Sequence, residues 1–144
     1  MPVIGPDITR RGLLLAVTSW VLRADDAQDV WDLFTEIAAA LSDSKPAEFM
    51  KAFARGMPSY ETLHTNVEAL LAAYELHSSI ELLKEDGDSA ARTVELDWFL
   101  QVVEKQDTAG VTRRREQARC QLVKQKKKWL ITAFEPLSLF KPLP

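Results

Sequence analysis

The sequence predicts an α+β fold in which three N-terminal helices pack on one face of a strongly bent, four-stranded antiparallel sheet. Between Asp25 and Tyr74 apolar residues recur with the period of an α-helix. From Leu76 onward they alternate with polar residues, and turn-forming residues separate the alternating stretches. Helices followed by a long, bent sheet would form a cone with one open mouth, which could hold a small molecule.

The first predicted helix begins at Asp25 and Asp26, whose carboxylates favour a helix N-terminus, and it runs for about 16 residues. The second has Pro46 in its first turn and ends at Gly56 and Pro58. Ser59 is the expected cap of the third. The apolar stripes of the three helices are Val30, Leu33, Phe34, Ile37, Ala38 and Leu41; then Phe49, Met50 and Phe53; then Leu63, Val67, Leu70, Leu71 and Tyr74.

The sheet is predicted from three turns, at Asp86-Gly87, at 107–110 and at 125–128, and the last strand runs from Lys128 to Glu135. Alternation gives each of the first three strands an inward row. These rows are Leu76, Ser78, Ile80 and Leu82; Val94, Leu96, Trp98, Leu100 and Val102; and Ala118, Cys120 and Leu122. The lysines at positions 124 and 126–128 are interpreted as a solvated hairpin tip.

The N-terminus has the composition of an export signal. Arg10 and Arg11 precede an uncharged run over residues 12–22, and Arg23-Ala24 follow it. A basic start, a short apolar run and a small residue at the exit are typical of a signal peptide, and 9–14 looks like the twin-arginine motif. We therefore expect residues 1–24 to be a removable leader and 25–144 to be one domain. The alternative is a first buried helix with a charged start.

Composition restricts the partners and the cellular location. The formal charge is −3, which argues against a dedicated nucleic-acid-binding protein. Cys120 is the single cysteine, so that an intrachain disulfide and a thiolate metal cluster are both excluded. The apolar run of the leader is shorter than the roughly 20 residues of a membrane span, so no stable membrane anchor is expected. The leader predicts a periplasmic or secreted bacterial protein.

The order of these elements, the long strands and the closing hairpin resemble the nuclear-transport-factor-2-like superfamily. The hairpin residues are Glu116, then 120–124 and 128–131, which end in Trp129-Leu130-Ile131. The resemblance covers roughly residues 25–135. Members of this superfamily include ketosteroid isomerase, scytalone dehydratase and the SnoaL-like cyclases. The resemblance implies a cystatin-like cone with a pocket between helices and sheet, and a homodimer through the outer sheet face, where Phe99 and Val103 lie.

Candidate site residues are those that would line the cone or stand at its mouth. Enzymes of this kind use a carboxylate base facing an acidic donor in an apolar pocket, as in the ketosteroid isomerase that is a standard example of this chemistry. Glu81, Glu95 and Asp97 all fall on the outward rows, and His64 and His77 have no metal-ligand spacing. The remaining candidates are ligand-binding residues, with no catalytic residue assigned: Phe53, Tyr60, Trp98, Arg114 and Glu116.

The leading hypothesis is therefore a non-catalytic, exported domain that binds an apolar small molecule or acts as an accessory protein, without a cofactor or metal. The alternative is a cofactor-independent isomerase, dehydratase or cyclase of the SnoaL-like type. If side chains fill the cone completely, neither of these two ligand hypotheses is favoured. The remaining function would then be that of a protein-interaction module. The aromatic residues that could either line or fill the cone are Trp31, Phe34, Phe53, Trp98 and Trp129.

Overall fold

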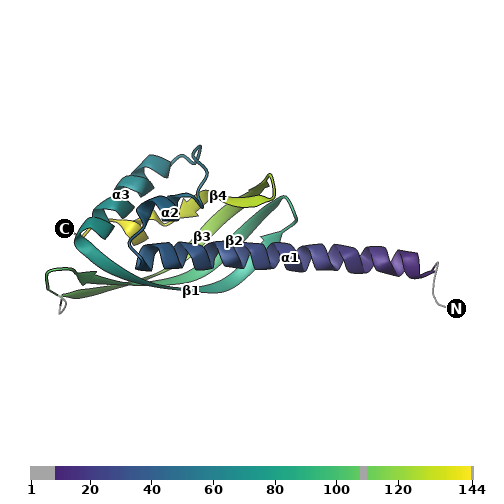
Figure 1. Ribbon diagram of the computed structural model, residues 1–144, viewed down its shortest axis with the longest axis horizontal. Coiled ribbons are helices and arrows are strands. Elements are labelled where there is room, and N and C mark those ends of the chain that lie inside the picture. The colour runs from purple at the N-terminus through teal and green to yellow at the C-terminus, as the bar shows by residue number, and fades with distance from the viewer. Residues whose placement is uncertain (1–8, 108–109, 144) are drawn as a thin grey trace.

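The computed structural model describes residues 9–107 and 110–143, with side chains from residue 26 onward. Helix α1 spans Thr9–Ser42 without interruption. It therefore begins well before the predicted start at Asp25, and Asp25 and Asp26 lie inside it. Figure 1 shows that the N-terminal turns of α1 extend beyond the sheet, whereas its C-terminal turns lie beside the sheet and α2. The prediction that residues 1–24 are a leader stays a prediction.

Two shorter helices follow. Helix α2 is only Pro46–Met50, and α3 spans Tyr60–Ala73 with Ser59 before its first turn, as expected. The predicted second helix was too long, because residues 52–54 leave the helix and run alongside the last strand. Ala54 N–H donates to Ile131 O and Ile131 N–H donates to Ala52 O, each at 2.8 Å. Phe53 thereby forms a parallel bridge with Ile131.

The sheet contains β1 (Tyr74–Gly87), β2 (Ala91–Glu104), β3 (Val111–Gln125) and β4 (Lys128–Glu135). The strands pair antiparallel in chain order, β1-β2-β3-β4, which confirms the predicted fold class. The three helices pack on one face of this sheet (Figure 1). A 3₁₀ turn, η1, follows β4 over Leu137–Phe140 and returns the chain to the helix side.

The inward rows of β2 and β3 are confirmed, since Trp98, Leu100, Cys120 and their row neighbours are buried. The row of β1 is wrong only at its end: Ile80 is partly buried against the core, but Leu82 is 36% exposed. A bulge between Leu82 and Lys84 inserts an extra residue, Leu83, opposite β2. β1 is also an edge strand, with a neighbouring strand on one side only. Past the bulge the alternation is reversed, and Glu85 lies opposite the inward residue Val94.

Candidate functional site

The centre of the cone is filled with aromatic side chains. The Trp98 ring packs edge-on against Phe134 at 5.7 Å and against Phe140 at 5.2 Å between ring centroids. Phe140 also meets Phe49 at 5.3 Å, and Phe49 meets Phe53 at 5.0 Å. The indole Nε1 of Trp98 donates to Ser78 Oγ at 2.7 Å, so that the polar edge of this ring has a partner as well. Of the residues expected to line or fill the cone, Trp31 does neither, because it is 38% exposed.

The five predicted ligand-binding residues do not form one site. Trp98 belongs to the packed centre. Phe53 and Tyr60 line a groove between the helices and β4, whereas Arg114 and Glu116 line a second groove at the edge of β3. The structure thus brings the predicted residues together in pairs rather than around a single cavity.

The first groove, here called the α2–α3 groove, has a volume of about 440 Å³. Its floor is apolar and includes the buried side chains of Met50, Phe53 and Tyr60. Its remaining lining residues come from α2, the segment after it, α3 and β4: Ala47, Lys51, Ala54, Arg55, His64, Lys128 and Leu130. Every permanently charged side chain in this set is a cation.

His64 joins the wall of this groove through the helical period. It follows Tyr60 by one turn of α3, and the two rings meet at 6.1 Å between centroids. Its Nε2 lies 3.6 Å from Glu68 Oε2, another turn further along. The sequence showed only that His64 lacks metal-ligand spacing, and it did not place His64 in this groove. The spacing i, i+4 from Tyr60 is the signal that could have found it.

The second groove, here called the β3-edge groove, has a volume of about 600 Å³. It is lined by four consecutive β3 residues and by the segment after β4: Arg113, Arg114, Arg115, Glu116, Ser138, Leu139, Lys141 and Pro142. Arg114 Nη1 donates to the Leu139 carbonyl at 2.7 Å. Partial burial lowers the pKa of Arg114, an effect that the nearby Tyr74 opposes.

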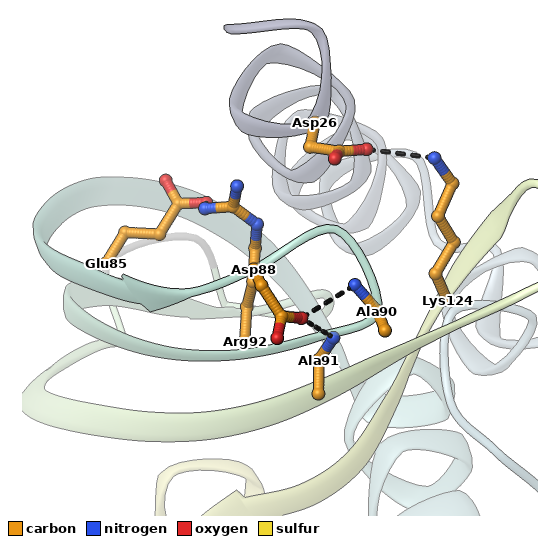
Figure 2. Close-up of polar contacts among 7 residues, drawn as sticks. All are labelled: Asp26, Glu85, Asp88, Ala90, Ala91, Arg92 and Lys124. Carbon is orange, nitrogen blue, oxygen red and sulfur yellow. Dashed lines mark hydrogen bonds and ion pairs between the residues drawn. The ribbon is translucent and has the colours of Figure 1, made fainter. Parts of the chain in front are cut away.

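A polar cluster lies at the end of the cone near the β1–β2 hairpin (Figure 2). Asp26, only 3% exposed, accepts a hydrogen bond at 2.9 Å from Lys124 Nζ, which comes from β3. Arg92 Nη1 pairs with Glu85 Oε2 at 2.6 Å. Arg92 Cζ and Lys124 Nζ each lie 5.9 Å from the centroid of the Trp129 ring. Five elements therefore converge on this cluster.

The cluster was not predicted from the sequence. Lys124 was assigned to a solvated hairpin tip, and this is wrong, because its side chain is 29% exposed and paired with Asp26. Strand alternation could have predicted that the side chains of Arg92 and Lys124 both point inward. Arg92 precedes the inward row of β2, and Lys124 follows that of β3. Two buried donors of the cluster, Arg92 Nε and Trp129 Nε1, have no hydrogen-bond partner among the described residues.

The Cys120 thiol is fully buried, and desolvation raises its pKa well above the ordinary value. Within the described residues, no cluster of three or more His, Cys, Asp or Glu side chains has metal-binding geometry. None of the helices in the same part of the chain combines the length and the apolar content needed to cross a membrane.

No protein-family model matches the sequence, and no curated protein matches it either. Solved structures do match the fold. A nuclear transport factor 2-like superfamily protein from Salmonella enterica is 11% identical, with 78% of this chain and 89% of that chain covered and a TM-score of 0.62. A hexachlorocyclohexane dehydrochlorinase, LinA type 2, is 10% identical over 81% and 86% of the two chains, with a TM-score of 0.64.

A protein of unknown function with a cystatin-like fold, from Nostoc punctiforme, is 17% identical over 75% of this chain and 86% of that chain, with a TM-score of 0.54. Identities this low show the fold alone. The chain therefore has the nuclear-transport-factor-2-like fold, with the cystatin-like cone that its sequence resembles.

Proposed function

We propose that this is a non-catalytic, exported domain that binds a small molecule in the α2–α3 groove. One observation carries the proposal: the groove combines an apolar floor with a rim whose permanent charges are all positive. Its volume of about 440 Å³ lies within the usual size range of ligand sites. Because the centre of the cone is packed, this groove is the place where Phe53 and Tyr60 can still contact a ligand.

The charges of the rim define the class of ligand. Lys51 is already paired with Glu48 at 2.9 Å. Arg55 and Lys128 have no ion-pair partner among the described residues, and they stand beside the apolar floor. An apolar body would cover Met50 and Phe53, while an anionic group would neutralise the two cations. The expected ligand is a small amphipathic anion, such as an aliphatic or aromatic carboxylate.

The arrangement favours binding over acid–base catalysis. Catalysis of that kind needs a base and an acid that reach the substrate together. The titratable pair in the groove, Tyr60 and His64, comes from neighbouring turns of one helix, so the two side chains lie next to each other rather than on opposite walls. Among the described residues, no carboxylate lines this groove.

Calorimetric titration with octanoate tests the proposal, with octanol as the uncharged probe of the same apolar length. We expect saturable binding of octanoate, and weaker binding of octanol because the alcohol leaves Arg55 and Lys128 unneutralised. Arg55→Gln and Lys128→Gln should each weaken octanoate binding about three- to tenfold. Lys126→Gln is the matched control, because it removes one positive charge from the β3–β4 hairpin outside the groove. Equal binding of octanoate by all variants, or tighter binding of octanol, would refute the proposal.

Export belongs to the same proposal and rests on the sequence of residues 9–24. The N-terminal turns of α1 extend beyond the sheet in Figure 1, and this geometry supports a leader that can be removed. Fractionation of bacterial cells that express the full chain should place a shortened protein outside the cytosol. Replacing Arg10 and Arg11 with Lys distinguishes the twin-arginine route from general secretion. A full-length protein retained in the cytosol would contradict export and would leave the binding proposal standing.

A second candidate function is a cofactor-independent elimination with Asp26 as the base. The observation in its favour is the buried carboxylate of Asp26, held at 2.9 Å by Lys124 beside the Trp129 ring. In such a step Asp26 would take a proton from carbon while a leaving group departs and a carbon–carbon double bond forms. Chloride release from hexachlorocyclohexane, the substrate named for one protein of the same fold, is a suitable assay. Chloride release that Asp26→Asn abolishes, with folding intact, would place this function ahead of binding.

A further inference from the structure

β3 has an unpaired edge along its first half. Its residues 111–118 pair with β2, but pairing with β4 begins only at Arg119. The first half of β3 therefore has a neighbouring strand on one side only. Backbone N–H and C=O groups on the other side are available to an additional strand.

The hydrogen-bond pattern identifies which residues face this edge. Glu104 N–H donates to Gly110 O, and Lys124 N–H donates to Ala90 O, at the two ends of the β2–β3 ladder. Hydrogen-bonded pairs of an antiparallel ladder recur every second residue, so the even-numbered residues of β3 bond to β2. The odd-numbered ones point their backbone groups away from β2. In the unpaired half these are Val111, Arg113, Arg115 and Gln117.

The β3-edge groove lies along these same backbone groups. Consecutive residues of a strand point their side chains to opposite faces of the sheet. A groove lined by all of 113–116 cannot lie over one face, and must run along the edge of the strand. Its far wall is the segment 138–142, fixed to β3 by the hydrogen bond from Arg114 to the Leu139 carbonyl.

The charges along the groove are mainly positive. Arg115 is occupied by a bidentate contact with Asp97, at 2.6–3.2 Å. Arg113 and Lys141 have no ion-pair partner among the described residues, and Glu116 is the single acid in the lining. A second copy of this chain would place like charges opposite each other along the same edge, and this is unfavourable.

The outer edge of β4 is bonded to residues 52–54 at Ile131. The free edge of β1 differs from that of β3 in both respects. β1 carries the bulge at Leu82/Lys84, which interrupts a regular ladder. Among its exposed charged residues, the acids Glu75, Glu81 and Asp86 also outnumber the single cation, Lys84. The edge of β3 is regular and basic, which selects it as the docking edge.

We propose that the free edge of β3 binds an extended, acidic peptide segment of another protein by strand addition. The peptide adds a strand antiparallel or parallel to β3 and bonds to the backbone of Val111, Arg113, Arg115 and Gln117. Its acidic side chains lie next to Arg113 and Lys141. This mode of recognition takes its affinity from main-chain hydrogen bonds and its specificity from the flanking side chains.

Fluorescence anisotropy with synthetic peptides tests this on the full chain. The probe is a labelled peptide of about eight residues that alternates Thr and Glu, the length of the free edge. A Thr/Lys peptide controls for charge. A Thr/Glu peptide with alternate N-methylated amides controls for main-chain bonding. At about 0.05 M salt we expect the Thr/Glu peptide to bind at least about tenfold more tightly than either control peptide.

Two variants separate the contributions of charge and backbone. Arg113→Glu should lower the affinity at least about tenfold, whereas Lys126→Glu, at the distant hairpin tip, should not. Gln117→Pro removes one N–H from the free edge without changing charge or a bond to β2, and should lower the affinity too. Equal binding of the N-methylated peptide would contradict strand addition. Absence of saturable binding, or self-association through this edge in sedimentation, would also overturn the proposal.

Discussion

The centre of the cone and its polar end are held together in different ways. At the centre, Trp98, Phe134 and Phe140 exclude water: the Trp98 ring meets both phenylalanines edge-on, and the two phenylalanine rings pack at a tilt. At the end, Asp26 and Arg92 are almost as deeply buried, but each depends on one oppositely charged partner. The centre is stabilised because apolar surface is removed from water. The polar end is stabilised only while both members of each ion pair are present.

The largest expected effect is at the centre. Trp98→Ala should lower the free energy of unfolding by about 3–5 kcal/mol, because it deletes a fully buried indole and leaves a cavity among aromatic rings. Urea denaturation measures this loss. A loss below about 1 kcal/mol would mean that the centre is not tightly packed.

Phe140→Ala tests whether the C-terminal 3₁₀ turn closes the centre. Phe140 is fully buried and contacts Phe49, Trp98 and Phe134. We expect a loss of about 3 kcal/mol, at the lower end for a buried Phe because η1 is short and can shift into the space. Leu137→Ala, at a partly buried position of the same turn, is the control and should cost clearly less.

At the polar end, Asp26→Ala should destabilise the protein by about 2 kcal/mol, since Lys124 would be left partly buried without its partner. Replacing both members, as Asp26→Leu with Lys124→Met, should recover most of this loss, because no unpaired charge remains. Denaturation of the parent protein, the two single variants and the double variant gives the free energies of unfolding for a double-mutant cycle. An additive loss in the double variant would show that the pair itself is not the source of the stability.

These two regions also differ in how far the sequence could predict them. The inward rows containing Trp98 and Cys120 follow from alternation alone, and the strand order follows from the turns. Glu85 could not be placed by parity, because the bulge at Leu82/Lys84 reverses the alternation beyond it. Asp26 and Lys124 are 98 residues apart, so their pairing depends on how α1 crosses the sheet.

The candidate site was predictable in part for the same reasons. Phe53 and Tyr60 were recognised as pocket residues, but their groove depends on residues 52–54 joining β4, which a helical pattern does not show. Arg114 and Glu116 were also predicted as ligand-binding residues. They line the β3-edge groove instead of the groove that contains Phe53 and Tyr60. The filling of the centre depends on η1 turning back, a segment that carries no helix or strand pattern.

The smallest expected effect concerns a surface pair, as a contrast to the buried ones. Arg115 hydrogen-bonds the Asp97 carboxylate and lowers its pKa below the ordinary 3.8, an effect that desolvation opposes. A lowered folded-state pKa means that the stabilisation is present above about pH 4 and is lost as the pH falls through the folded-state value. Asp97→Asn should therefore be slightly less stable than the parent protein near neutral pH. The difference should vanish in acid, as denaturation at a series of pH values would show.

The most direct test of the account is a two-dimensional ¹H–¹⁵N spectrum recorded during titration with octanoate. The central claim is that the ligand binds in the α2–α3 groove and that the cone centre stays closed. We predict shifts for the backbone amides of Tyr60, His64 and Leu130, and an unchanged indole Nε1–H signal of Trp98, which remains bonded to Ser78. A shifted Trp98 indole signal with unchanged groove amides would contradict the claim, because it would place the ligand inside the cone.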